Sequence, residues 1–149
     1  MTPIDPSDWF IILARVSLAI FTGGLVGLER QLEHKPAGLR THMLVSLGAA
    51  MFVMTGLQLG AGTDNVGRVM QGIVAGIGFL GAGEIFAKSR TNPHEVKIQG
   101  LTSAAAIWVS ASLGVASGVG LWQIALTGAI ATVFILQVVK LVEKPLNSD

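Results

Sequence analysis

The feature that most constrains this chain is a series of five apolar segments, each about as long as a helix that crosses a lipid bilayer. The segments cover residues 9–28, 41–60, 66–87, 101–117 and 121–142. An apolar segment of this length crosses a membrane as a helix, because a helix satisfies its own backbone N–H and C=O groups. The sequence therefore predicts an all-α fold, a polytopic transmembrane helix bundle in a single domain over residues 1–149.

The composition agrees with a membrane protein and excludes two other classes. Hydrophobic residues make up 51% of the chain and charged residues only 13%. A disordered chain needs low hydrophobicity and high charge, and so little polar surface could not cover a soluble core. The net charge of +1 provides no electrostatic reason to bind nucleic acid. We therefore expect contact with the lipid bilayer and no nucleic-acid partner.

The basic residues predict how the chain crosses the membrane. Eight of the ten Lys and Arg residues follow the first or third segment or lie at or beyond the end of the fifth, namely Arg30, Lys35, Arg40, Lys88, Arg90, Lys97, Lys140 and Lys144. The opposite side has only Arg68, and Arg15 lies inside the first segment. Short cytoplasmic loops carry the excess of Lys and Arg. The N-terminus is therefore expected outside and the C-terminus in the cytoplasm.

Glycines predict close helix packing. Four segments each contain a GxxxG pair, Gly23/Gly27, Gly56/Gly60, Gly72/Gly76 and Gly114/Gly118. Such pairs let helix backbones approach closely in lipid. Their number exceeds what one bundle needs, so we expect self-association, as a dimer. Residues 118–120 (GVG) predict a tight turn between the last two spans rather than one long kinked helix.

No motif in the chain indicates an enzyme. Residues 76–81 (GIGFLG) match the dinucleotide-binding pattern GxGxxG, but that pattern requires a turn between a strand and a helix. Here it lies inside an apolar segment, where small residues serve helix packing. There is no cysteine, and His34, His42 and His94 fall in or beside the predicted cytoplasmic loops, where we expect headgroup contacts. We predict no catalytic residues and no bound organic cofactor.

Arg15 is an unusual residue, because a charge inside a span is costly and commonly faces the bundle or a water-filled cavity. Asp8 and Asp64 are the carboxylates expected on the correct side to pair with it. The alternative is that Arg15 reaches toward the outer headgroups. Arg15, Thr22 and Glu29 are spaced seven residues apart and predict one polar stripe along the first helix.

Glu29 and Glu84 are candidate Mg²⁺ ligands, because both lie where their spans meet the predicted cytoplasmic side. Together with Thr41 or Thr102 they would offer the oxygen ligands that Mg²⁺ prefers. The competing interpretation is that the two carboxylates form ion pairs with basic neighbours, drawn from Arg30, Arg40, Lys88 and Lys97.

Three stretches occur in an order that is typical of one protein family. Residues 27–30 (GLER) with 35–42 (KPAGLRTH), then 76–83 (GIGFLGAG), then 100–105 (GLTSAA), resemble the signature stretches of the MgtC/SapB family of bacterial membrane proteins. The resemblance implies a multi-pass protein of the bacterial inner membrane that is associated with growth under magnesium limitation and with stress adaptation, including survival inside host cells. The best-known members carry a soluble C-terminal domain after the fifth span, so the chain resembles a short form without it.

Two functions remain open from the sequence. The first is a non-enzymatic protein that regulates or assists magnesium and ion homeostasis, with other membrane proteins as candidate partners. The second is a small cation transporter or channel, with Mg²⁺ as the candidate ion. Few ionisable groups are available to line a pathway near the membrane midplane, which favours the first interpretation.

Overall fold

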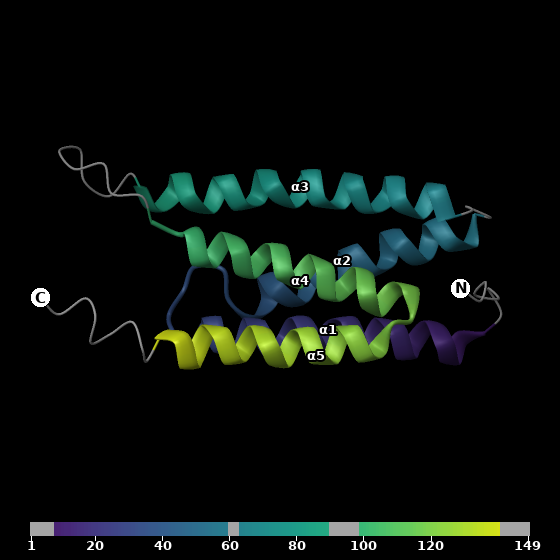
Figure 1. Ribbon diagram of the computed structural model, residues 1–149, viewed down its shortest axis with the longest axis horizontal. Coiled ribbons are helices and arrows are strands. Elements are labelled where there is room, and N and C mark those ends of the chain that lie inside the picture. The colour runs from purple at the N-terminus through teal and green to yellow at the C-terminus, as the bar shows by residue number, and fades with distance from the viewer. Residues whose placement is uncertain (1–7, 60–62, 90–98, 141–149) are drawn as a thin grey trace, which may run out of the picture.

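Five helices run up and down in succession through the computed structural model, which describes residues 8–59, 63–89 and 99–140 (Figure 1). They are α1 (Trp9–Leu32), α2 (Leu39–Gln58), α3 (Thr63–Ser89), α4 (Leu101–Val119) and α5 (Trp122–Phe134). A π-helical turn, η1 (Ile135–Val139), continues α5. Five helical segments are long and apolar enough to cross a membrane, the last being Trp122–Val139. The predicted all-α bundle with five spans is confirmed for these ranges.

The turn between α4 and α5 is built around Gly120. This residue has a φ of +87°, in the left-handed region that glycine adopts without steric cost. The N–H of Gly120 donates to the carbonyl of Ser117, and the N–H of Leu121 donates to that of Ala116. Such bonds close a helix C-terminus. The fourth and fifth spans are therefore separate helices, as predicted, although residues 118 and 119 still belong to α4.

Helix α4 is the centre of the bundle, because it packs against α1, α2, α3 and α5. Of the apolar stretch of α4 that would cross the membrane, 56% is buried inside the protein, whereas only 6% of the corresponding stretch of α3 is buried. Figure 1 draws α3 along one edge of the bundle, away from α1 and α5. Residues 76–81 lie inside α3, so the GxGxxG pattern is helical and not a nucleotide-binding turn.

Two of the GxxxG pairs join helices within the bundle. A Cβ added to Gly23 of α1 would lie 2.6 Å from the backbone oxygen of His42 on α2. A Cβ added to Gly118 of α4 would lie 2.7 Å from the backbone oxygen of Ala50, also on α2. Both positions require glycine, because real Cβ atoms do not approach backbone oxygens so closely. Helices α1, α2 and α4 therefore form a core held together by backbone contact.

The GxxxG pair of α3 makes no close backbone contact, because a cavity of about 730 Å³ separates it from α2. A Cβ at Gly72 or Gly76 would meet nothing within 4 Å among the described residues. The structure therefore assigns this pair to no tight helix contact, and self-association stays a prediction.

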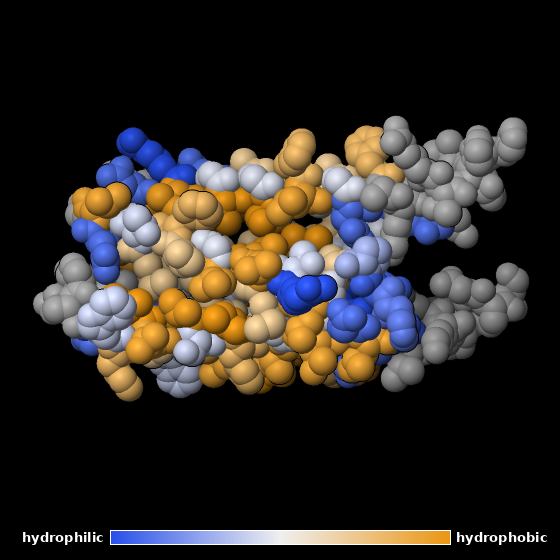
Figure 2. All heavy atoms as spheres, turned by 180° about the vertical axis from the view of Figure 1, so that it is seen from behind, coloured by the Kyte–Doolittle hydropathy of each residue, from blue (hydrophilic) through white to orange (hydrophobic). Residues whose placement is uncertain are grey.

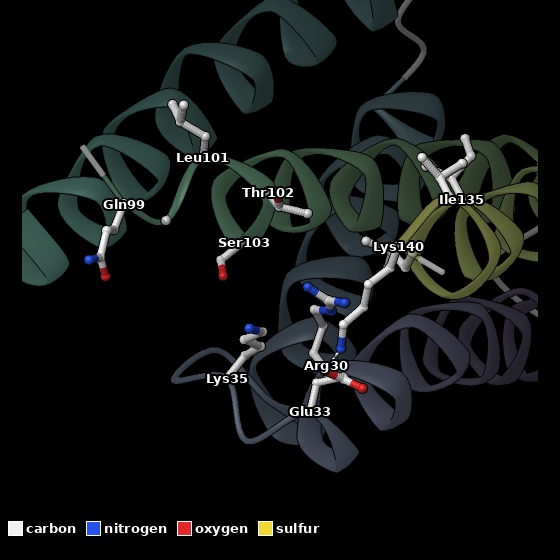
Figure 3. A pocket seen from close by; sticks show the side chains of 12 residues that line it. Arg30, Glu33, Lys35, Gln99, Leu101, Thr102, Ser103, Ile135 and Lys140 are labelled. Carbon is white, nitrogen blue, oxygen red and sulfur yellow. Dashed lines mark hydrogen bonds and ion pairs between the residues drawn. The ribbon is translucent and has the colours of Figure 1, made fainter. Parts of the chain in front are cut away.

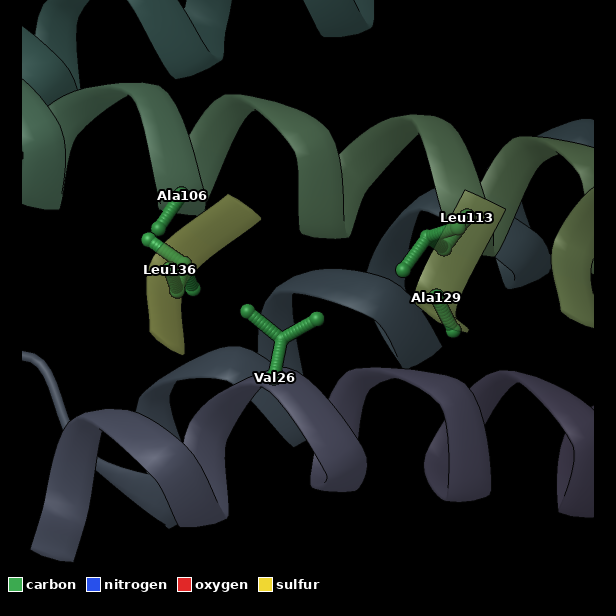
Figure 4. Packing of buried hydrophobic residues seen from close by; sticks show 5 residues of the cluster. All are labelled: Val26, Ala106, Leu113, Ala129 and Leu136. Carbon is green, nitrogen blue, oxygen red and sulfur yellow. The ribbon is translucent and has the colours of Figure 1, made fainter. Parts of the chain in front are cut away.

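The outer surface suits lipid, and the apolar core is small. Figure 2 shows mostly apolar side chains along the body of one face, with hydrophilic residues more frequent toward the ends. Phe10 and Phe79 are among the most exposed apolar side chains. Inside, the side chain of Val26 on α1 points toward α4 and the fifth span, between Ala106 and Leu136 on one side and Leu113 and Ala129 on the other (Figure 4). The members of this cluster are Val26, Ala106, Leu113, Ala129 and Leu136.

Candidate functional site

A row of buried polar side chains follows the contact between α1, α2 and α4. We call it the polar seam, and it consists of Arg15, Thr22 and Glu29 of α1, His42 and Ser46 of α2, and Ser103, Ser110 and Ser117 of α4. All of these except Arg15 are at most 5% exposed. Polar groups are rare and costly inside a membrane, and they commonly mark a functional site there. The seam is therefore the first candidate site of the chain.

The polar residues of the seam recur at the same seven-residue interval in α1 and in α4. Residues 15, 22 and 29 are seven apart, and so are residues 103, 110 and 117. Because seven residues make about two helical turns, each set lies on one face of its helix. The two helices run in opposite directions, which brings Arg15 to the end of α4 and Glu29 to its beginning.

His42 and Ser110 form the centre of the seam. The Nδ1 atom of His42 lies 2.9 Å from the Oγ atom of Ser110, and both side chains are fully buried. The Nε2 atom of His42 and the Oγ atom of Ser46, one turn further along α2, are buried without a hydrogen-bond partner among the described residues. These two atoms leave hydrogen-bonding capacity for a water molecule or an ion inside the bundle.

The expectation that His42 contacts headgroups is therefore wrong. The side chain is fully buried, because Gly23 and Gly27 of α1 let the first turns of α2 approach α1 closely. The seven-residue spacing of three serines on α4 was the signal in the sequence that could have located the seam. His34, by contrast, is exposed in the connection between α1 and α2.

Glu29 and Arg30 form a buried ion pair at the end of α1. The guanidinium of Arg30 donates from Nη2 to Oε1 of Glu29 at 2.8 Å and from Nε to Oε2. The side chain of Arg30 is 4% exposed and that of Glu29 is 5% exposed. A two-point contact of this kind is the strongest geometry for Arg and a carboxylate. It engages both oxygens of Glu29, which matches the structural interpretation of that residue as one half of an ion pair.

Arg15 joins α1 to the end of α4. Its Nη1 atom donates to the carbonyl oxygen of Gly118 at 2.8 Å. The last carbonyls of a helix attract cations, because they carry the negative end of the helix dipole. Asp8 accepts from the backbone N–H of Ile11 at 3.3 Å, so it caps α1. The side chain of Asp64 lies outside the described residues.

The other predicted site residues fall on two cavities. Glu84 and Thr41 line one of about 270 Å³, and Oε1 of Glu84 is buried there without a hydrogen-bond partner among the described residues. Thr102 and Arg30 line another of about 550 Å³. Arg40 is exposed. In the described ranges no three His, Asp or Glu residues are grouped so that they could hold a metal, and a Mg²⁺ site shared by Glu29 and Glu84 stays a prediction.

One further ion pair connects α1 to the end of the fifth span. Lys140 donates to the carboxylate of Glu33, just beyond α1. The Lys140 ammonium holds the pKa of this carboxyl below its ordinary value, with smaller contributions from Lys35 and Arg30. These four side chains lie where α1 ends and α4 begins, which we call the basic end of the bundle.

The fold and the seam together define an all-helical, multi-pass membrane protein with a polar core. Within that class the chain belongs to the MgtC family, whose sequence model matches residues 16–145. This match confirms the resemblance that the three signature stretches carry.

Named relatives support the same family. The chain is 39% identical over 140 residues to Protein SrpB of Synechococcus elongatus, covering 89% of this chain and 77% of SrpB. It is 38% identical to "Putative magnesium transporter YhiD" of Escherichia coli K12, covering 87% of this chain and 60% of YhiD. It is 48% identical over 120 residues to Protein MgtC of Brucella abortus, covering 80% of this chain and 46% of that protein. The chain thus spans from about half to about three quarters of the length of these relatives. No solved structure matches the chain.

Proposed function

We propose that the chain is a non-enzymatic protein that regulates or assists magnesium and ion homeostasis in the bacterial inner membrane. The observation that carries this proposal is that the two charged residues of the polar seam, Arg15 and Glu29, are both bound to protein groups. Arg15 is bound to the Gly118 carbonyl, and Glu29 is bound at both oxygens by Arg30. An ion pathway needs charged or polar groups that are free to exchange protein partners for the ion, and these groups are engaged.

The connection to magnesium comes from the family. The relative YhiD, which is 38% identical to this chain over 136 residues, is named a putative magnesium transporter. Relatives with these names come from bacteria, which supports a bacterial membrane as the location. The positions of the Lys and Arg residues support the basic end as the cytoplasmic one.

A small cation transporter is the second candidate, and one specific observation favours it. His42 Nε2 and Ser46 Oγ are buried inside the bundle without a hydrogen-bond partner among the described residues, and polar groups inside a membrane protein commonly mark an ion pathway. Under this alternative the polar seam would carry the ion, with His42 as its titratable group.

Two measurements on the whole chain separate the candidates. The first is Mg²⁺ entry into liposomes that contain the purified protein and a trapped Mg²⁺-sensitive dye. The second is growth at low magnesium of a bacterial strain that lacks its own family member and expresses this chain. Restored growth without entry above protein-free liposomes is the expected result. Protein-dependent entry would establish transport instead, and failure to restore growth would contradict the magnesium role.

A pair of matched variants extends the test to the seam. His42→Asn removes the buried imidazole, whereas His34→Asn changes an exposed histidine whose φ of 54° asparagine tolerates. If growth depends on the seam, His42→Asn impairs it and His34→Asn does not. Equal growth of the two variants, at equal protein levels, would remove the seam from the proposed function.

A further inference from the structure

The largest polar cavity of the described residues opens at the basic end of the bundle (Figure 3). Its volume is about 550 Å³. The cavity lies between the end of α1, the first turn of α4 and the end of the fifth span. Its lining includes Arg30, Lys35, Ser103, Val139 and Lys140. Neither the ion pairs nor the proposed function accounts for a cavity of this composition.

Cationic groups outnumber anionic groups around this cavity. Arg30, Lys35 and Lys140 line it, and Glu33 is the one acidic residue in its lining. The charge of Arg30 is balanced by its ion pair with Glu29, and the charge of Lys140 is balanced by its ion pair with Glu33. Lys35 has no ion-pair partner among the described residues, so one positive charge remains uncompensated. The Nη1 atom of Arg30 also stays free of hydrogen bonds within the described part of the chain, because Glu29 is bound through Nε and Nη2.

The first turn of α4 directs backbone donors at the same cavity. The helix begins after Gly100, which has a φ of +90° and no side-chain cap. A Cβ at Gly100 would lie 3.1 Å from the backbone oxygen of Glu84, so glycine allows this turn to pack against α3. The first backbone bond of the helix runs from the N–H of Ala104 to the carbonyl of Gly100. Within the described part of the chain, the amides that precede Ala104 in α4 have no hydrogen-bond acceptor, and a helix N-terminus attracts anions.

Ser103 adds a hydroxyl group to the polar wall of the cavity. Its side chain is 3% exposed and lines the cavity, yet its hydroxyl makes no hydrogen bond within the described residues. Figure 3 shows this hydroxyl directed into the cavity, toward the side on which Lys35 and Arg30 lie. This oxygen is not one of the fully buried unpartnered atoms of the described residues, so it is accessible from the cavity and can donate to a group bound there. A ligand oxygen in the cavity would accept this hydrogen bond.

The remaining wall is apolar and irregular. Ile135, Leu136 and Val139 belong to the π-helical turn η1 and line the cavity on the same side as Lys140 (Figure 3). Single π-helical turns occur frequently at functional sites. Polar and apolar walls side by side suit a phosphate that is attached to an acyl glycerol, and the polar wall alone suits a free phosphate ion.

We propose that this cavity binds a phosphate group, held by Arg30, Lys35, the hydroxyl of Ser103 and the N-terminal amides of α4. The group has two candidate sources with the same chemistry, the headgroup of an anionic phospholipid and inorganic phosphate. Arg recognises phosphate oxygens with two parallel donors. Basic pockets between helices on the cytoplasmic side are typical places for anionic lipid headgroups. The site goes beyond the proposed function and does not depend on it.

The test measures binding to the full chain purified in a neutral detergent. In the first arm, native mass spectrometry compares phosphatidylglycerol with diacylglycerol of the same acyl chains, which lacks the phosphate. In the second arm, calorimetry compares sodium phosphate with sodium chloride at equal ionic strength, without added lipid. Binding in the first arm alone identifies the lipid headgroup as the source. Binding in the second arm identifies free phosphate as a ligand.

Three variants decide whether the binding occurs in this cavity. Lys35→Gln is expected to weaken binding about fivefold, which corresponds to about 1 kcal/mol for one basic side chain near an anionic group. Ser103→Ala removes only a hydroxyl that has no hydrogen-bond partner among the described residues, so it should fold normally and weaken binding several-fold. Arg40→Gln is the matched control, because Arg40 is exposed on the neighbouring helix and does not line the cavity.

Absence of binding in both arms would overturn the proposal. So would binding that Lys35→Gln or Ser103→Ala leaves unchanged, or that Arg40→Gln weakens equally. Because these measurements do not involve magnesium, their failure is distinguishable from failure of the proposed function.

Discussion

Alanine at Gly114 is expected to separate α2 from α4. A Cβ at this position would lie 2.7 Å from the backbone carbonyl carbon of Ser46 and 2.8 Å from its Cα, and still closer to its oxygen. Ordinary van der Waals contact begins at 3.4 Å, and backbone atoms cannot rotate aside as a side chain can. The two helices must therefore move apart. Ser110 and His42 lie one turn away on the same helices, so their hydrogen bond should lengthen as well.

The expected magnitude follows from overpacking. Adding a methyl group to a close-packed site that cannot relax costs about 1–3 kcal/mol. Alanine also favours a helix over glycine by about 1 kcal/mol, which acts in the opposite direction. Gly76→Ala isolates this second effect, because Gly76 lies in α3 with nothing within 4 Å of the added Cβ among the described residues. The difference between the two variants therefore measures the α2–α4 contact itself.

The assay is reversible unfolding in mixed micelles, with increasing sodium dodecyl sulfate and detection by circular dichroism. Gly114→Ala should unfold at a lower mole fraction of dodecyl sulfate than the wild type, and Gly76→Ala should unfold at an equal or higher one. If Gly114→Ala is as stable as Gly76→Ala, the close approach of α2 and α4 is wrong. A variant Gly114→Val should be less stable than Gly114→Ala, since the added volume is larger.

Three further outcomes are expected. Glu29→Gln leaves the buried Arg30 guanidinium without its carboxylate and should cost about 3–5 kcal/mol of unfolding free energy in the same assay; stability equal to the wild type would contradict the ion pair. The stability difference between wild type and Glu33→Gln should be small, because the Glu33–Lys140 pair is partly exposed. Since the pKa of Glu33 is lowered in the folded protein, this difference should be present at neutral pH and vanish as the pH falls through that pKa, and a difference that grows in acid would refute the pairing. The chain has no cysteine, so Asn65→Cys supplies a single thiol, which a membrane-impermeant maleimide should label in intact cells if the N-terminus is outside; labelling only after permeabilisation would reverse the orientation.

The five helices were predictable because their cause is local. A run of apolar residues of spanning length forms a helix in lipid regardless of what its neighbours are. The break near Gly120 was predictable for the same reason, since only the length of the apolar run was needed. The π-helical turn after Phe134 was not predictable, because residues 135–139 continue the apolar pattern of an ordinary helix.

The candidate site was predictable only in part. The stripe of Arg15, Thr22 and Glu29 follows from spacing along one helix, and the structure directs it toward α4. His42 was misread, because its position near a loop says nothing about which way its helix is rotated. Thr41 and Thr102 line two different cavities. This separation depends on how α3 and α4 pack against each other, which cannot be read from the sequence around either residue.

By itself the sequence determined the number of spans, their helical form, their charge asymmetry and the family stretches. Only the tertiary structure decided which GxxxG pairs are used, since those of α1 and α4 pack against α2 whereas a cavity separates that of α3 from α2. It alone decided that His42 faces Ser110 and that Arg30 binds Glu29. The physical reason is that helix formation in a membrane depends on the chain's own backbone and length. The depth and partners of a side chain depend instead on how each helix is rotated and displaced against the others.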